Sequence, residues 1–127
     1  MLKVGLSSLG ILMLVGCASN LTKTPELAVS DRAQTRVDAL MMGDYEKAYK
    51  FTTPGYRSSF PLNRYKSSYL GASGWTFAKV NNVQCDESVC NVTIDIRYKS
   101  AYASGEIASQ LTEKWISIDD KWWLYLK

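Results

Sequence analysis

The sequence contains no histidine, and this absence removes a large group of reactions from consideration. Nucleophiles that depend on an imidazole base, as in Ser-His-Asp and Cys-His arrangements, are excluded. A zinc site is not expected either, because the three cysteines have no histidine to complete a ligand set. We therefore predict that the protein holds no metal and no cofactor.

An excess of charge of one sign is also missing. The chain has 15 Lys+Arg and 12 Asp+Glu, which gives a formal net charge of +3. Removal of residues 1–16 would take away Lys3 and leave 14 basic against 12 acidic residues, a net charge of +2. An excess this small argues against a nucleic-acid partner.

The N-terminal apolar run is too short to cross a membrane. Residues 4–15 carry no charge, but they fall short of the roughly 20 residues that a spanning helix needs. With Lys3 before it, the run is typical of the h-region of a secretory signal. Leu14-Val15-Gly16-Cys17 then resembles a bacterial lipobox. The resemblance implies a lipoprotein signal peptide over 1–16; a plain signal peptide with an incidental cysteine and an uncleaved anchor are the alternatives.

On the lipobox interpretation Cys17 carries the lipid, and 17–24 form the lipidated N-terminus and a tether. A single acyl chain binds a membrane only marginally, so a diacylglycerol thioether with a further N-acyl chain would anchor the protein stably. Aspartate after the cysteine resembles an inner-membrane retention signal of enteric-type bacteria. Ala18 stands there instead, and this favours an outer-membrane location facing the periplasm.

The two remaining cysteines, Cys85 and Cys90, enclose the short segment "DESV". An exported protein meets an oxidising compartment, so the two thiols are expected to pair. The flanking residues are strand-like, and the spacing differs from the Cys-x-x-Cys of redox-active pairs. We predict a structural disulfide across a β-hairpin.

The first half of the chain has helical periodicity. Thr24 with Pro25 predicts a capped helix start, and Ser30 is an alternative cap. Apolar residues then recur at helical spacing: Ala33, Val37, Leu40 and Met41. Asp44 is predicted to cap a further turn or two, which "TTPGY" at 52–56 ends. A second short helix is expected in "PLNRYKSSYL", followed by a flexible connection at 71–74.

The second half of the chain alternates with the period of β-strands. Val92, Ile94, Ile96 and Tyr98 share one face of a predicted half-buried strand. Pairing through the cysteines places Val83 opposite Val92, and we expect a bulge at Asn81-Asn82 that turns Val80 inward. Two more strands are expected around Asp119-Asp120.

This order of elements resembles the nuclear-transport-factor-2-like superfamily, a cystatin-like cone. The resemblance covers 25–127 and includes the helix "GDYEKAY…P.YR" and the final "DDKWW" hairpin. It implies an α+β fold in which N-terminal helices pack on a curved four-stranded antiparallel sheet. The superfamily includes isomerases, dehydratases, binding proteins and assembly modules, so the fold does not settle the function.

Glu113 is the candidate catalytic residue. If Asp119-Asp120 form a two-residue turn, 113 pairs with 126 and Glu113 joins an apolar face with Leu111, Trp115, Trp122, Leu124 and Leu126. Enzymes use carboxylates in such surroundings as general acids and bases. A longer turn, a bulge or a strand end open to solvent would leave Glu113 without this role.

The other face of the same hairpin is also apolar, with Ile116, Ile118, Trp123 and Tyr125. A sheet covered by helices on one side is normally polar on the other, so this cluster indicates an interaction surface. We expect a homodimer or an envelope-protein partner to cover it.

Together these patterns predict a non-catalytic, lipid-anchored cell-envelope protein whose cone domain binds a partner or a small ligand. One alternative is a small enzyme, similar to the isomerases and dehydratases, that uses Glu113 with a tyrosine. The other is a structural assembly subunit.

Overall fold

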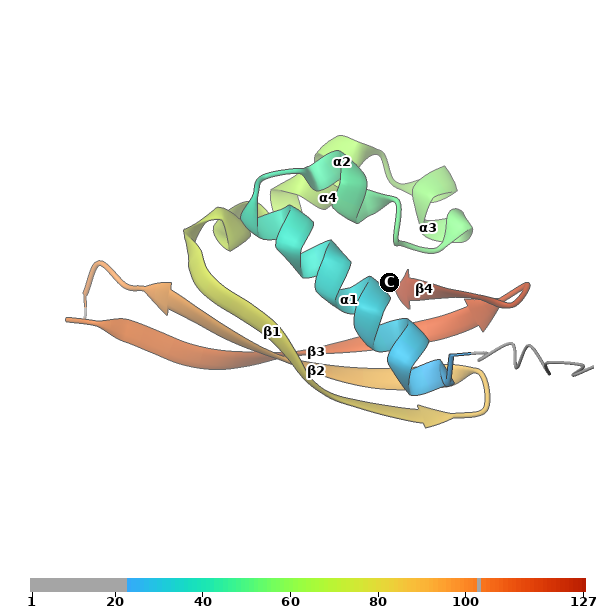
Figure 1. Ribbon diagram of the computed structural model, residues 1–127. Helices are drawn as coiled ribbons and strands as arrows, with labels where there is room; N and C mark the ends of the chain where they lie inside the picture. The colour runs from blue at the N-terminus through green and yellow to red at the C-terminus, as the bar shows by residue number, and fades with distance from the viewer. Residues whose placement is uncertain (1–22, 103) are drawn as a thin grey trace, which may run out of the picture.

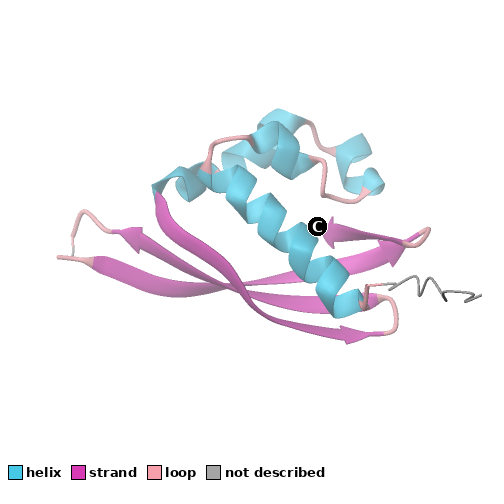
Figure 2. Ribbon diagram, in the orientation of Figure 1, coloured by secondary structure: helices cyan, strands magenta, loops and turns pink. Residues whose placement is uncertain are grey.

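The computed structural model describes residues 23–102 and 104–127. The predicted signal peptide at 1–16, the lipidation site Cys17 and most of the tether lie outside the described residues. The described chain forms two layers, with every helix on one side of a single twisted sheet (Figures 1 and 2). The predicted α+β class is confirmed.

Helix α1, Pro25–Met41, runs across the sheet and packs mainly on β1 (Figure 1). It starts where the sequence predicts, because Pro25 occupies its first turn and the Thr24 hydroxyl accepts a hydrogen bond from the Leu27 amide. The alternative start at Ser30 is therefore wrong. The residues that α1 buries are Val29, Ala33, Arg36, Val37, Ala39 and Leu40. Arg36 is the one charged member of this buried face.

Three short helices and a 3₁₀ turn form the remainder of the helical layer: α2 (Tyr45–Tyr49), α3 (Pro54–Ser59), α4 (Leu62–Ser68) and η1 (Leu70–Gly74). Asp44 caps α2 as predicted, after Gly43 has turned the chain at a φ of 75°. The sequence "TTPGY" does not only end α2. Thr53 caps a new helix with Pro54 in its first turn, so the same residues also start α3. The connection at 71–74 lies in η1.

The sheet is an antiparallel meander of β1 (Trp75–Asp86), β2 (Val89–Lys99), β3 (Glu106–Ile118) and β4 (Lys121–Tyr125). Val83 pairs with Val92, and the register shifts between Val80 and Asn82, so the predicted bulge is confirmed. Asp119 and Asp120 both have positive φ, which gives the two-residue turn between β3 and β4.

The free edge of β4 is covered by the segment between α2 and α3. The Leu124 amide donates to the Phe51 carbonyl at 2.8 Å, and the Thr53 amide donates to the Leu124 carbonyl at 3.1 Å. Thr52 and Leu124 form a parallel bridge. An unpaired strand edge invites association with other chains, so this contact protects the short final strand and closes one side of the cone.

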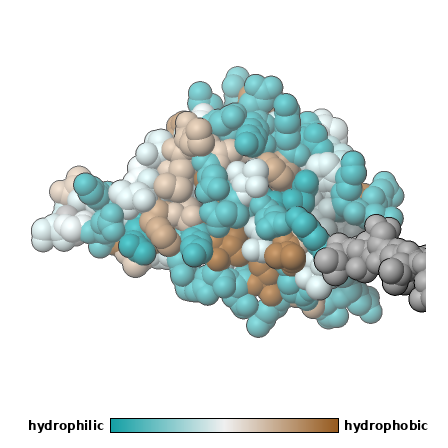
Figure 3. Space-filling view, in the orientation of Figure 1, coloured by the Kyte–Doolittle hydropathy of each residue, from teal (hydrophilic) through white to brown (hydrophobic). Residues whose placement is uncertain are grey.

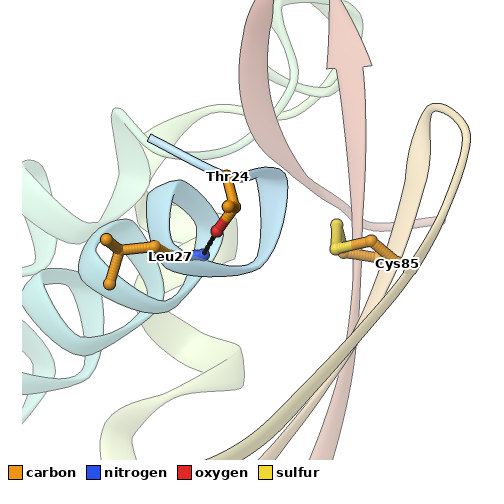
Figure 4. The surroundings of a disulfide bond; sticks show 4 residues. Thr24, Leu27 and Cys85 are labelled. Carbon is orange, nitrogen blue, oxygen red and sulfur yellow. Dashed lines mark hydrogen bonds between the residues drawn. A yellow bond between two sulfur atoms is a disulfide. The ribbon is translucent and has the colours of Figure 1, made fainter. Parts of the chain in front are cut away.

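A disulfide joins Cys85 and Cys90 across the β1–β2 hairpin. Cys90 is fully buried in the same cluster as Val29 of α1, so the bond lies against the beginning of that helix. Figure 4 shows the Thr24 cap on the first turn of α1 together with the bond at Cys85. In the space-filling view, hydrophilic residues cover most of the visible face around a compact apolar patch where α1 meets the sheet (Figure 3). Across 23–102 and 104–127, no helix is long and apolar enough to cross a membrane.

Candidate functional site

A buried polar cluster lies between α1 and the inner face of the sheet, and Arg36 is at its centre. The side chain of Arg36 is completely shielded from solvent. Its Nη1 forms an ion pair with Oε1 of Glu113 on β3. Its Nε donates to the hydroxyl of Tyr65 on α4 at 3.0 Å. One arginine therefore connects three elements that are distant in the sequence.

Glu113 faces inward, on the face that the hairpin arithmetic predicts. Trp115 pairs with Leu124 and Ser117 with Trp122, although β4 ends at Tyr125, so 126 does not pair with 113. The second carboxylate oxygen of Glu113 accepts a hydrogen bond from Trp115 Nε1 at 2.9 Å. Both oxygens of Glu113 are thus occupied by donors from its own chain. This geometry is that of a counter-ion to Arg36.

Two tyrosines enclose the guanidinium from the helical layer. The Cζ atom of Arg36 lies 4.8 Å from the ring centroid of Tyr69 and 5.8 Å from that of Tyr65, within the range of cation–π attraction. Burial raises the pKa of both tyrosine hydroxyls, although Arg36 acts in the opposite direction. Both phenols therefore stay protonated at neutral pH and act as neutral hydrogen-bonding groups.

Arg36 keeps its charge in this environment. Burial by itself lowers the pKa of the guanidinium, but Glu113 and the two tyrosines raise it above its ordinary value. Nη2 is buried and has no hydrogen-bond partner among the described residues. Leaving a buried donor unsatisfied costs about 1–3 kcal/mol, so Nη2 is the least stabilised polar group of this cluster.

A pocket of about 430 Å³ opens beside this cluster, between η1 and the sheet. Its walls come from the end of α4, from η1, from the first residue of β1 and from β2 and β3. The lining residues are Ser68, Tyr69, Gly71, Ala72, Gly74, Trp75, Tyr98, Lys99 and Leu111. The size is within the range of small-molecule sites, which are mostly apolar with a few polar groups.

The pocket and the buried cluster share a wall. Tyr69 lines the pocket and also lies against the guanidinium of Arg36. Leu111 lines the pocket and precedes Glu113 by two residues, which places both on the same face of β3. Glu113 itself is not among the lining residues. Sequence reasoning missed Arg36, although a charged residue inside the apolar stripe of a predicted helix was a usable signal.

The predicted interaction surface is on the opposite side of the sheet. Ile116 lies between Val89 of β2 and Trp123 of β4, so Val89 extends the row that the sequence identified. Ile118 and Tyr125 are 38% and 41% exposed. Ile116 and Trp123 are half-buried. The apolar cluster is therefore contiguous, and its assignment to a partner stays a prediction.

Part of Trp123 is covered from within the chain. The guanidinium carbons of Arg32 on α1 and Arg57 on α3 each lie 5.2 Å from its ring centroid. Arg32 also donates from Nε to the Trp122 carbonyl at 2.7 Å, and burial lowers its pKa. These arginines shield one part of the Trp123 side chain, so Ile118 and Tyr125 are the more accessible members of the surface.

No group of three or more His, Cys, Asp and Glu side chains that could hold a metal occurs within the described part of the chain. Cys85 and Cys90 are bonded to each other, and Glu113 is paired with Arg36.

The arrangement of helices and sheet is similar to several solved structures. A nuclear transport factor 2-like protein from Campylobacter jejuni aligns with a TM-score of 0.60 and 11% identity, over 76% of this chain and 96% of that one. Another nuclear transport factor 2-like protein, of unknown function, from Shewanella oneidensis aligns with a TM-score of 0.53 and 13% identity, over 76% and 91%. The present chain therefore has the nuclear-transport-factor-2-like fold.

A protein from Psychrobacter arcticus that contains a SEC-C motif has a TM-score of 0.63 and 15% identity. The alignment covers 83% of this chain and 62% of that one. No protein-family model matches the sequence, and no curated protein matches it. At identities this low, structural similarity shows the fold alone, so the function has to be argued from the site itself.

Proposed function

We propose that the protein is a non-catalytic, lipid-anchored cell-envelope protein whose cone domain binds a small ligand in the pocket between η1 and the sheet. The observation that carries this proposal is the pocket of about 430 Å³ with aromatic and aliphatic walls at Tyr69, Trp75 and Leu111. Such walls bind an apolar body by removing its surface from water.

The state of Glu113 argues against the enzyme alternative. A general acid or base must reach the proton that it transfers, within about 3 Å or through one water. Glu113 does not line the pocket, and both of its oxygens accept hydrogen bonds from Arg36 and Trp115. Burial raises the pKa of the Tyr65 and Tyr69 hydroxyls, which moves both still further from neutral pH and makes them poor proton donors and acceptors there. The cluster is better suited to holding α1 and α4 on the sheet.

Lipid anchoring is the second part of the proposal and depends on Cys17. The first helix begins at Pro25, eight residues after Cys17. Eight fully extended residues span at most about 29 Å, so a lipid on Cys17 would keep the domain next to the bilayer. The pocket would then sample molecules close to the membrane surface.

Binding can be tested with a neutral aromatic probe, indole-3-acetamide, and the full-length protein in lipid nanodiscs. We expect saturation-transfer NMR to detect binding to the wild type beyond that to empty nanodiscs. Leu111→Trp should abolish this signal, because Leu111 lines the pocket. Thr112→Trp is the matched control, since Thr112 is exposed on the other face of the same strand. Equal binding by wild type and Leu111→Trp would show that the pocket is not the site.

A further inference from the structure

Two arginines lie against one tryptophan at the free edge of β4. The guanidinium carbons of Arg32 on α1 and Arg57 on α3 are each 5.2 Å from the ring centroid of Trp123. Nε of Arg32 donates to the Trp122 carbonyl at 2.7 Å, and Nε of Arg57 donates to the Thr52 carbonyl at 3.2 Å. Main-chain acceptors thus hold both side chains in place. We call Arg32, Arg57 and Trp123 the arginine–tryptophan surface.

The charges of these two arginines are not compensated by the domain itself. Neither arginine forms an ion pair within 23–102 and 104–127, and Asp31, the acidic neighbour of Arg32 in the sequence, is paired with Lys23 at 2.6 Å. On each guanidinium, Nε is the one nitrogen with a hydrogen bond among these residues, so both Nη groups are available. Arg32 and Arg57 are partly exposed. Two forked sets of donors are therefore accessible to an anion from outside the domain.

The sequence around Arg57 adds to this excess of positive charge. From Lys47 to Cys85 the chain has no aspartate and no glutamate. The basic residues of the helical layer in this stretch are Lys47, Lys50, Arg57, Arg64 and Lys66. Lys50 lies 4.0 Å from Glu46, and the other four have no ion-pair partner in the described part of the chain. The helical layer is therefore complementary to a negatively charged partner.

The arginine–tryptophan surface is close to the residue where the predicted tether joins the domain. Arg32 follows Pro25, the first residue of α1, by seven positions, which is about 10 Å along the helix axis. Cys17, the predicted lipidation site, precedes Pro25 by eight residues, and so short a segment spans at most about 29 Å. A bilayer that held a lipid on Cys17 would thus be within reach of both arginines.

We propose that the arginine–tryptophan surface binds the headgroup phosphates of anionic phospholipids in the membrane that carries the Cys17 anchor. The inference rests on the anchoring proposed above and goes beyond it, because it specifies which side of the domain faces the bilayer. Guanidinium groups bind phosphate oxygens through paired N–H donors, and tryptophan is enriched at the level of the headgroups. Together with the anchor, this contact gives the domain two points of attachment and fixes its orientation.

The test measures the rate at which phenylglyoxal modifies each arginine, followed by peptide mass spectrometry. Protein extracted from membranes is reconstituted in nanodiscs of phosphatidylcholine alone and of equal parts of phosphatidylcholine and phosphatidylglycerol. On the anionic nanodiscs we expect Arg32 and Arg57 to react roughly fivefold more slowly, the factor that one basic residue gains near such a surface. Arg97 is the internal control. Its Cζ also lies over an aromatic ring, 4.1 Å from the centroid of Phe77, but it is exposed on the outer face of the sheet, away from the helical layer.

Two variants at one position separate the effect of charge from that of shape. Arg57→Gln should remove most of the protection of Arg32 on the anionic nanodiscs, because one of the two cations is lost. Arg57→Lys keeps the charge and should retain the protection. Arg97→Gln is the matched control and should leave the protection of Arg32 unchanged. Concentrated salt should abolish the protection in the wild type, because it screens the attraction between the arginines and the phosphates.

The outcomes distinguish this inference from the anchoring on which it rests. Intact-mass measurement of the same sample reports the acyl chains on Cys17, and their absence would overturn the anchoring and the inference together. Acylated protein in which Arg32 and Arg57 react equally fast on both kinds of nanodisc would overturn the inference alone. An equal slowing of Arg97 would also overturn it, because the contact would then not be confined to the arginine–tryptophan surface.

Discussion

Arg36 and Glu113 are 77 residues apart in the sequence and form a buried ion pair between α1 and β3. The side chain of Arg36 is 0% exposed and that of Glu113 is 9% exposed. The pair lies between the two layers. At one end Arg36 donates a hydrogen bond to the Tyr65 hydroxyl, and at the other Trp115 donates one to Glu113. Removing one member of such a pair leaves a charge without compensation in a medium of low polarity.

Glu113→Ala should therefore lower the free energy of unfolding by about 3–5 kcal/mol, because it strands the Arg36 charge. The double variant Arg36→Met/Glu113→Leu should recover most of that loss, since apolar side chains of similar volume replace both charges. Urea denaturation followed by circular dichroism measures both. Glu106→Ala is the control on the same strand, where the exposed side chain should change stability by under about 0.5 kcal/mol. A loss for Glu113→Ala no larger than that of the control would contradict a buried ion pair.

The Cys85–Cys90 bond should account for about 2 kcal/mol of stability, the amount that the loop-entropy argument assigns to so small a ring. The variant Cys85→Ala/Cys90→Ala should lose this amount in the same denaturation experiment. Thiol labelling of exported, unreduced protein should find neither cysteine free. Two labelled thiols per chain would show that the bond does not form in the cell envelope.

Stability should decline at alkaline pH because of the buried tyrosines. Burial raises the pKa of Tyr65 and Tyr69 above the ordinary value of 10.0. The unfolded chain therefore loses these protons at a lower pH than the folded chain does. Below about pH 10 the two states bind the same number of protons at these groups; above it, the free energy of unfolding falls as pH rises.

Tyr65→Phe tests this origin, since it removes one titrating group and leaves the ring in place. The variant should show a shallower decline above pH 10 in pH-dependent urea denaturation. It should also be less stable at neutral pH, because Arg36 Nε loses the acceptor that it has at 3.0 Å. An unchanged alkaline slope would assign the decline to other groups.

Lipidation at Cys17 predicts a specific behaviour of the Cys17→Ser variant. It should appear in the soluble fraction or accumulate as an unprocessed precursor, whereas the wild type should fractionate with membranes. Intact-mass measurement should find the wild type cleaved before Cys17 and carrying acyl chains. A mature N-terminus elsewhere with no modification would contradict the proposed anchor.

The apolar outer face should mediate association of two copies. Ile118 and Tyr125 are large and partly exposed, and burying the exposed part of each would contribute roughly 1 kcal/mol. We expect light scattering to give a dimer, and we expect Tyr125→Glu and Trp123→Glu to give a folded monomer. A wild-type monomer at high micromolar concentration would leave a different envelope protein as the partner. Loss of folding in Trp123→Glu would mean that its contacts with Arg32 and Arg57 are needed for the fold.

Local patterns were sufficient for most of the secondary structure. The Thr24-Pro25 start of α1, the two-residue turn at Asp119-Asp120 and the bulge after Val80 all follow from a few adjacent residues. Alternation along β2 and β3 then determines which side chains face inward, because a strand has a period of two. The inward orientation of Glu113 could be deduced in this way.

Contacts between distant segments decided everything else about the site. The start of α3 is an exception, because Thr53-Pro54 repeats the local cap signal of Thr24-Pro25, and the interpretation of 52–56 as only a helix end missed it. The cover that Phe51 and Thr53 place on the edge of β4 depends on main-chain bonds to Leu124. No local pattern encodes this contact with β4.

The same limit applies to the charge at the centre of the molecule. An arginine in the apolar stripe of α1 is stable only if an acceptor and a counter-charge reach it, and those come from α4 and β3. These contacts make Glu113 a counter-ion rather than a candidate base, and they leave Nη2 of Arg36 without a partner among the described residues. Sequence periodicity determines which way a side chain points, whereas its chemical role depends on the three-dimensional neighbours that set its charge and its hydrogen bonds.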